Sequence, residues 1–99
     1  MDLSQFKATL AAGNPPSNLT HALQALWYDA TGDWQIAHKH AQAQDDAIGA
    51  WVHAYLPRKE GDVANARYWY RRAGRPMAAT TLDAEWDAIA TELLAHDTS

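Results

Sequence analysis

Apolar residues recur at spacings of three and four along most of the chain, and this spacing predicts amphipathic helices rather than strands. Breaks at residues 13–16, at Gly32, at Gly61 and at residues 74–76 separate the periodic segments. Each of these glycines can adopt the left-handed conformation that ends a helix. The pattern therefore predicts an all-α chain of six helices, which cover about 2–12, from Ser17 or Asn18 to about 30, from Asp33 to about 45, about 46–58, from Asp62 to about 73, and about 81–95.

Each expected helix carries one apolar stripe that should face the core. The stripe residues, in chain order, are Leu3, Phe6 and Leu10; Leu19, Leu23, Leu26, Trp27 and Ala30; Trp34, Ala37, Ala41 and Gln44; Ile48, Trp51, Val52, Tyr55 and Leu56; Val63, Ala66, Tyr70 and Ala73; and Leu82, Trp86, Ile89 and Leu93. Ser17 or Asn18 is the expected N-cap of the second helix, and Thr80 or Thr81 is that of the sixth.

A short motif occurs twice, at Thr31-Gly32-Asp33 and at Glu60-Gly61-Asp62. In both, Gly can end one helix and Asp can cap the next, so the turn is short enough only for antiparallel neighbours. An alanine follows each Asp at the same offset, at Ala37 and Ala66, where a small residue lets two helices approach closely. The pattern predicts two stacked helical hairpins related by an internal repeat.

The Gly-Asp-x-x-x-Ala pattern resembles the tetratricopeptide repeat, and residues 62–73 (DVANARYWYRRA) resemble the second helix of Sel1-like repeats. Together with His53-Ala54-Tyr55-Leu56, the segment is similar to a family of small uncharacterised bacterial and fungal proteins with an HAxLxRxEGDxxNAxYWxRR block. The resemblance covers roughly residues 20–75 and implies a short right-handed superhelix, but little about function. Pro57 departs from a regular repeat helix, and we expect the fourth helix to kink or end there.

These elements make one domain: an N-terminal helix and linker (1–16), two hairpins (17–75) and a C-terminal capping helix (76–99). We expect the apolar stripe of the last helix to pack on the second hairpin and cap its open hydrophobic end. The alternative is that it pairs with its twin in a weak homodimer.

Composition narrows the function classes. The 99 residues include no cysteine, which excludes disulfides and thiolate chemistry, and the opening MDLSQFKATL does not read as a signal peptide, so a cytoplasmic protein without membrane contact is expected. The net charge is −4, but residues 57–75 hold six Lys or Arg against two carboxylates (+4), and the rest holds two Lys against ten carboxylates (−8). The acidic remainder argues against nucleic acid, whereas the basic segment suits an acidic protein or peptide.

Aromatic and guanidinium groups are most concentrated in residues 65–72, where three consecutive aromatic residues lie between Arg67 and Arg71-Arg72. Five residues are candidates for a partner-binding surface on a concave face, because Trp, Tyr and Arg are enriched at binding hot spots: Asn65, Arg67, Tyr68, Trp69 and Arg72. The competing interpretation is packing, with the rings half-buried and the arginines paired to Asp29, Asp45 and Asp46.

A second candidate site involves His38, His53 and Glu60, which antiparallel packing of the third and fourth helices would bring together. Two histidines and a carboxylate can hold a divalent metal or perform acid–base chemistry. No complete catalytic or metal signature occurs in the chain, and no cofactor is expected. We therefore expect a non-enzymatic interaction module for a protein or peptide, with a small anionic-ligand or divalent-metal site, catalytic or not, as the alternative.

Overall fold

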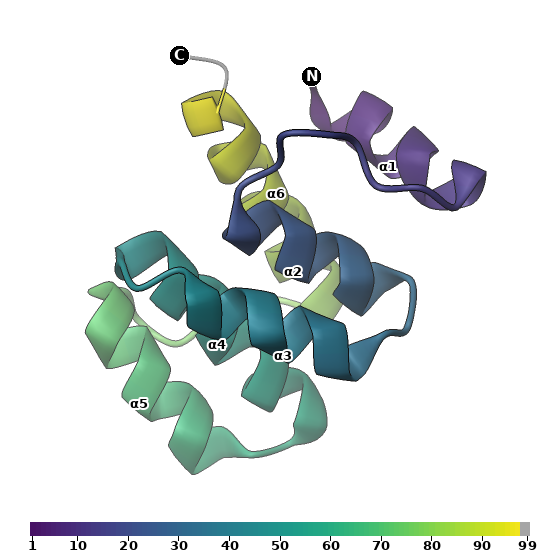
Figure 1. The fold of residues 1–99 in the computed structure, drawn as a ribbon. Coiled ribbons are helices and arrows are strands. Elements are labelled where there is room, and N and C mark those ends of the chain that lie inside the picture. Colours follow the sequence, from purple (N-terminus) through teal and green to yellow (C-terminus); the bar gives the residue numbers. More distant parts are fainter. Residues whose placement is uncertain (98–99) are drawn as a thin grey trace.

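The computed structural model describes residues 1–97, and these fold into six helices with no strand (Figure 1). This confirms the all-α prediction. The helices are α1 (Leu3–Ala12), α2 (His21–Ala30), α3 (Trp34–Ala43), α4 (Ala47–Glu60), α5 (Val63–Ala73) and α6 (Leu82–Asp97). The last two residues of the expected C-terminal unit, 76–99, lie outside the described part. None of the described helices is long and apolar enough to cross a membrane.

The two predicted hairpins are present: α2 packs on α3, and α4 packs on α5. Their turns have the same backbone geometry. Gly32 and Gly61 have φ angles of 87° and 85°, and the caps Asp33 and Asp62 have φ/ψ angles of −95°/81° and −87°/78°. Each Asp N–H also donates to a carbonyl five residues back, at 2.9 Å in both turns. The repeat in sequence is thus a repeat in local structure.

The centre of the fold is α4, which contacts α2, α3, α5 and α6. Every residue from Gly49 to Pro57 is buried, because neighbouring helices cover all sides of this stretch. The helix continues through Pro57 to Glu60, so of the two outcomes expected at Pro57, a kink or an end, the end is wrong. Pro57 lies in the last turns of the helix, where its missing N–H removes only one backbone bond, and its ring is buried among neighbours.

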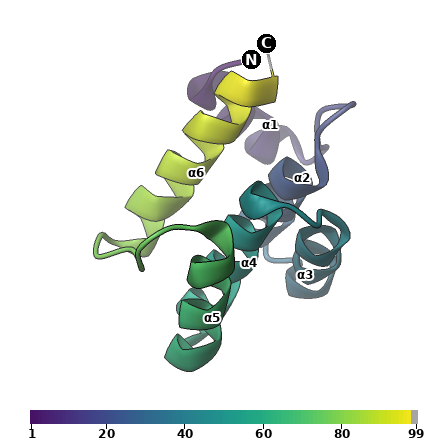
Figure 2. The same ribbon diagram turned by 90° about the vertical axis from the view of Figure 1, so that its left-hand side faces the viewer.

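The sixth helix packs on α4 and α2, and α1 packs on α6 (Figure 2). Trp86 connects α6 to the first hairpin through its indole N–H, which donates to the carbonyl of Leu26 at 3.1 Å, and through its ring, which stacks on Phe6 of α1. The apolar stripe of α6 is therefore buried within the chain, against one helix from each hairpin.

Several local predictions need correction. The N-cap of α2 is Thr20, not Ser17 or Asn18, because Asn18 takes a left-handed conformation (φ 65°) and the helix begins only at His21. Two expected core residues, Ala30 and Val63, are exposed, and they are the last residue of α2 and the first residue of α5. The remaining stripe residues are buried or half-buried.

Candidate functional site

The aromatic–arginine segment of α5 divides into two faces. Ala66 and Tyr70 are buried against α4, whereas Tyr68 is 47% exposed. Because the extensive contacts of α5 are with α4 alone, this helix forms one edge of the molecule, and its outer face is open (Figures 1 and 2).

Trp69 lies at the junction of the two faces. Its ring is half-buried and stacks on His53 of α4, with ring centroids 3.8 Å apart and planes 20° from parallel. The guanidinium carbon of Arg72 lies 5.0 Å from the Trp69 ring centroid, within the range of a cation–π interaction. The indole is therefore already packed by residues of the chain itself.

Arg72 also contacts Tyr68: it donates to the phenolic oxygen at 3.2 Å, and its guanidinium lies 5.9 Å from that ring. The only carboxylate near it in the described residues is Asp45, at 3.8 Å. Because Asp45 is 95% exposed and the pair is long, solvent screens the interaction, and the charge of Arg72 is largely available to a partner. We call Tyr68, Trp69 and Arg72 the Tyr68 face.

The ring contacts continue across α4 to α3. His38 lies 5.9 Å from His53 and 4.4 Å from Trp34, both measured between ring centroids and both in edge-on geometry. A row of aromatic and imidazole rings thus runs from Trp34 to Trp69 along one side of three helices. Two shallow hollows of about 440 and 240 Å³ lie along this row, and their lining includes Trp34, His38 and Glu60 in the first and Gln42, Asp45, His53 and Trp69 in the second.

The electrostatics of the row favour neutral imidazole at its centre. Burial, and then the neighbouring His38 and Arg72, lower the pKa of His53 from 6.5 to about 4. At neutral pH His53 is therefore an uncharged ring that stacks on Trp69. Protonation of His53 would bring a second cation next to Arg72.

The structure brings together only part of the predicted partner-binding set. Tyr68, Trp69 and Arg72 are in mutual contact, as described above. Asn65 is exposed in the first turn of α5, where its backbone N–H is capped by Asp62 at 3.3 Å. Arg67 is exposed on a neighbouring face of α5, where it lines a groove with Tyr70.

The expected arginine–aspartate pairs are present only for Arg72 and Asp45. Asp29 is buried and binds Lys59 at 3.1 Å instead, which joins the first hairpin to the second. Asp46 caps α4 by accepting from Gly49 N–H at 2.7 Å. The packing interpretation therefore assigned these two carboxylates the wrong partners.

The histidine alternative has part of the expected geometry. His38 and His53 face each other, and His38 Nε2 lies 3.6 Å from Glu60 Oε1. Among residues 1–97, however, no group of three or more His, Asp or Glu side chains is arranged to hold a metal ion.

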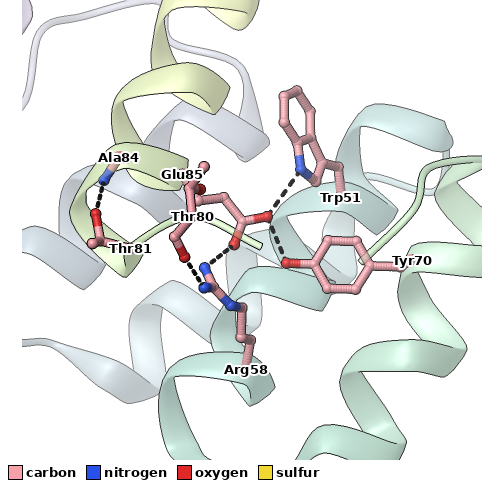
Figure 3. A network of polar contacts seen from close by, with 7 residues as sticks. All are labelled: Trp51, Arg58, Tyr70, Thr80, Thr81, Ala84 and Glu85. Atoms are coloured by element: carbon pink, nitrogen blue, oxygen red, sulfur yellow. Dashed lines mark hydrogen bonds and ion pairs between the residues drawn. The ribbon is translucent and has the colours of Figure 1, made fainter. Parts of the chain in front are cut away.

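A buried polar network that was not predicted from the sequence surrounds Glu85 (Figure 3). Glu85 is 3% exposed on α6 and accepts from Tyr70 Oη at 2.5 Å, from Arg58 at 2.8 Å and from Trp51 Nε1 at 3.4 Å. Arg58 also donates to the carbonyl of Thr80. A signal was present, since Glu85 occupies a stripe position, three residues after Leu82 and four before Ile89.

Each polar group of this network has a hydrogen-bond partner within the fold. Burial, followed by the hydrogen bond to Glu85, raises the pKa of Tyr70, so the phenol remains a donor. No buried side-chain nitrogen or oxygen in the described part lacks a hydrogen-bond partner. The network locks α4, α5 and α6 together and fixes the inner side of α5.

Comparison of the chain with protein-family models, with curated proteins and with solved structures gave no match.

Proposed function

We propose that the protein is a non-enzymatic interaction module that binds a protein or peptide segment through the outer side of α5. The observation that carries the proposal is the state of Tyr68 and Arg72. They contact each other and Trp69, yet Tyr68 is 47% exposed and the Arg72 side chain is 48% exposed. Tyrosine, tryptophan and arginine are the residues that most often dominate binding energy at interfaces.

Rigidity of the support favours the same conclusion. The rings of the Tyr68 face stand on a helix whose inner side is fixed by Tyr70 and Glu85. A surface held in place loses little conformational entropy when a partner binds, and this raises affinity. The expected concave superhelix of tetratricopeptide or Sel1-like type is part of the proposal. Its support is the repeated turn at Gly32 and Gly61. A cytoplasmic location stays a prediction of the sequence.

Site-specific photo-crosslinking tests the proposal. A photoreactive phenylalanine analogue replaces Tyr68 in one protein and the exposed Ala12 of α1 in a control, and both are irradiated in extract of the native cell. The proposal predicts protein adducts that form from position 68 only. They should be lost in the Arg72→Gln background and kept in the Lys39→Gln background, which removes an exposed charge from α3. Identical adducts from both positions, or none from position 68, would contradict it.

A further inference from the structure

A groove of about 260 Å³ lies beside the Tyr68 face, between α5 and the segment that follows it. Its lining is formed by Arg67, Tyr70, Arg71, Arg75, Pro76 and Met77. No acidic residue contributes to this lining. The groove is therefore the part of the surface where the basic segment of the chain is least neutralised.

The three arginines of the groove differ in how they are held. Arg75 is fixed: its guanidinium carbon lies 3.6 Å from the ring centroid of Trp51, and it donates to both carboxylate oxygens of Glu92 at 2.9 Å. Arg67 and Arg71 are exposed, and neither forms an ion pair with a carboxylate of the described residues. The groove thus has one ordered wall and two arginines whose charges have no partner within residues 1–97.

The floor of the groove is apolar and firm. Tyr70 is 2% exposed and held by Glu85, and Pro76 has a fixed φ. Met77 is half-buried against the core and has a flexible, polarisable side chain that adapts to different apolar shapes. Such a floor accepts an apolar side chain better than a solvated anion alone.

We propose that this groove binds an acidic segment of a protein partner, with two carboxylates on Arg67 and Arg71 and one apolar side chain on the floor. This inference rests on the proposed function and names the chemistry of the partner. Residues four apart on a helix are separated by about 6 Å along its axis. Arg67 and Arg71 therefore match carboxylates four residues apart on a partner helix or two apart on an extended segment, where the spacing is about 6.6–6.8 Å. Guanidinium forks can bind such carboxylates in a bidentate manner.

Charge balance favours a peptide over a nucleic acid as the occupant. The chain has a net charge of −4, which repels a long polyanion, and the groove offers only two uncompensated cations. A short acidic segment places its charge only where these arginines are. The apolar floor adds a contact that a phosphate backbone cannot use.

Fluorescence anisotropy with a defined peptide panel tests the inference. Each labelled probe carries one leucine and two glutamates at different spacings. Matched probes carry glutamine or lysine in place of glutamate, and a single-stranded DNA oligonucleotide serves as a further probe. The proteins are wild type, Arg67→Gln/Arg71→Gln, the charge-reversed Arg67→Glu/Arg71→Glu, the control Lys39→Gln, and Tyr68→Ala/Arg72→Gln.

The inference predicts that a glutamate probe binds the wild type and that its glutamine counterpart does not. Arg67→Gln/Arg71→Gln should weaken binding by about tenfold or more, and Lys39→Gln by less than about twofold. The charge-reversed protein should prefer the lysine probe. Restored binding of that kind shows a direct charge contact and cannot result from misfolding.

Three outcomes would overturn the inference. The first is tighter binding of the oligonucleotide than of every peptide, and the second is no binding of any glutamate probe at millimolar concentration. The third is a loss of peptide binding in Tyr68→Ala/Arg72→Gln that Arg67→Gln/Arg71→Gln does not show, which would leave the proposed function standing. Conversely, if probes bind through the groove but position 68 gives no adducts, the role proposed for the Tyr68 face is wrong and the groove inference stands.

Discussion

Tyr68 and Tyr70 are two residues apart on the same helix, and they show how differently one residue type is used on its two sides. Tyr70 is 2% exposed and donates to a buried carboxylate, whereas Tyr68 is 47% exposed and accepts from an exposed arginine. The difference arises from the helix position, since two residues correspond to roughly 200° of rotation. The inner side is bonded by the chain, and the outer side is left for another molecule.

The arginines repeat this contrast. The Arg58 side chain is 16% exposed and binds Glu85 at 2.8 Å, while the Arg72 side chain is 48% exposed and lies 3.8 Å from the solvent-exposed Asp45. A buried, well-bonded pair is costly to break, and an exposed long pair contributes little. The comparison teaches that tyrosine next to arginine does not by itself indicate a binding surface. Whether such a pair belongs to the core or to the surface depends on whether the chain supplies a buried carboxylate for it to bind.

Removal of that carboxylate should give the largest effect on stability. Glu85→Ala leaves the Arg58 guanidinium and the Tyr70 hydroxyl without their acceptor inside the fold. We expect the free energy of unfolding to fall by about 3–5 kcal/mol, as measured by urea denaturation. Glu92→Ala, which breaks the half-exposed pair with Arg75, is the matched control and should cost about 1 kcal/mol or less. Equal effects of the two substitutions would mean that the Glu85 network is not a buried lock.

The two tyrosines give a sharper test at a smaller scale. Tyr70→Phe removes only the hydroxyl and leaves Glu85 short of one donor, so we expect a loss of about 1–3 kcal/mol. Tyr68→Phe removes the same atom from an exposed ring and should stay within about 0.5 kcal/mol. Chemical denaturation of the two variants and of the wild type measures both losses. A difference below the measurement error would contradict the division of α5 into two faces.

The contrast also shows what the sequence could predict. The six helices and the two equivalent turns follow from local signals, because a glycine with positive φ and an aspartate cap act within a few residues. The start of α2 was predicted too early. Asn18 takes a left-handed conformation, whereas an N-cap residue is typically extended, as Thr20 is. The sequence left open whether α4 kinks or ends at Pro57, and the helix continues because tertiary burial offsets a local penalty.

For the candidate site, the sequence could predict which residues are buried or exposed, but not which of them lie together. The sequence indicated that Tyr70 is inside and that Tyr68 and Arg72 are at the surface. It could not indicate that Arg67 belongs to a different groove, because this depends on where residues 75–77 pass after α5 ends. The Glu85 network joins residues up to 34 positions apart, and such pairings depend on the arrangement of whole helices.

The short turn before α4 provides a third test, because it carries Asp45, the partner of Arg72. A Cβ atom added at Gly49 would lie 1.9 Å from the carbonyl oxygen of Gln44. Gly49→Ala should therefore destabilise the protein by about 1–3 kcal/mol through overpacking, as measured by thermal and urea unfolding. Ala47→Ser changes an exposed position two residues earlier, and it should change the free energy of unfolding by about 0.5 kcal/mol or less. If Gly49→Ala stabilises instead, helix propensity outweighs the contact and the turn is looser than described.

The last test concerns His53, which lies between the inner and outer sides of α5 and whose pKa is lowered to about 4 by burial, His38 and Arg72. The folded protein therefore binds a proton on His53 less readily than the unfolded chain does. Its contribution to stability is present above pH 6.5 and is lost as the pH falls toward 4. An NMR titration of the imidazole Cε1–H signals should show one histidine with this low midpoint that is missing in His53→Gln. Arg72→Gln removes a neighbouring cation and should move the midpoint upward, whereas Lys39→Gln should not. A His53 midpoint near 6.5 in the wild type would show that the ring is hydrated rather than stacked on Trp69. In that case the solvent-accessible surface of α5 would extend inward from Tyr68 to the rings of Trp69 and His53.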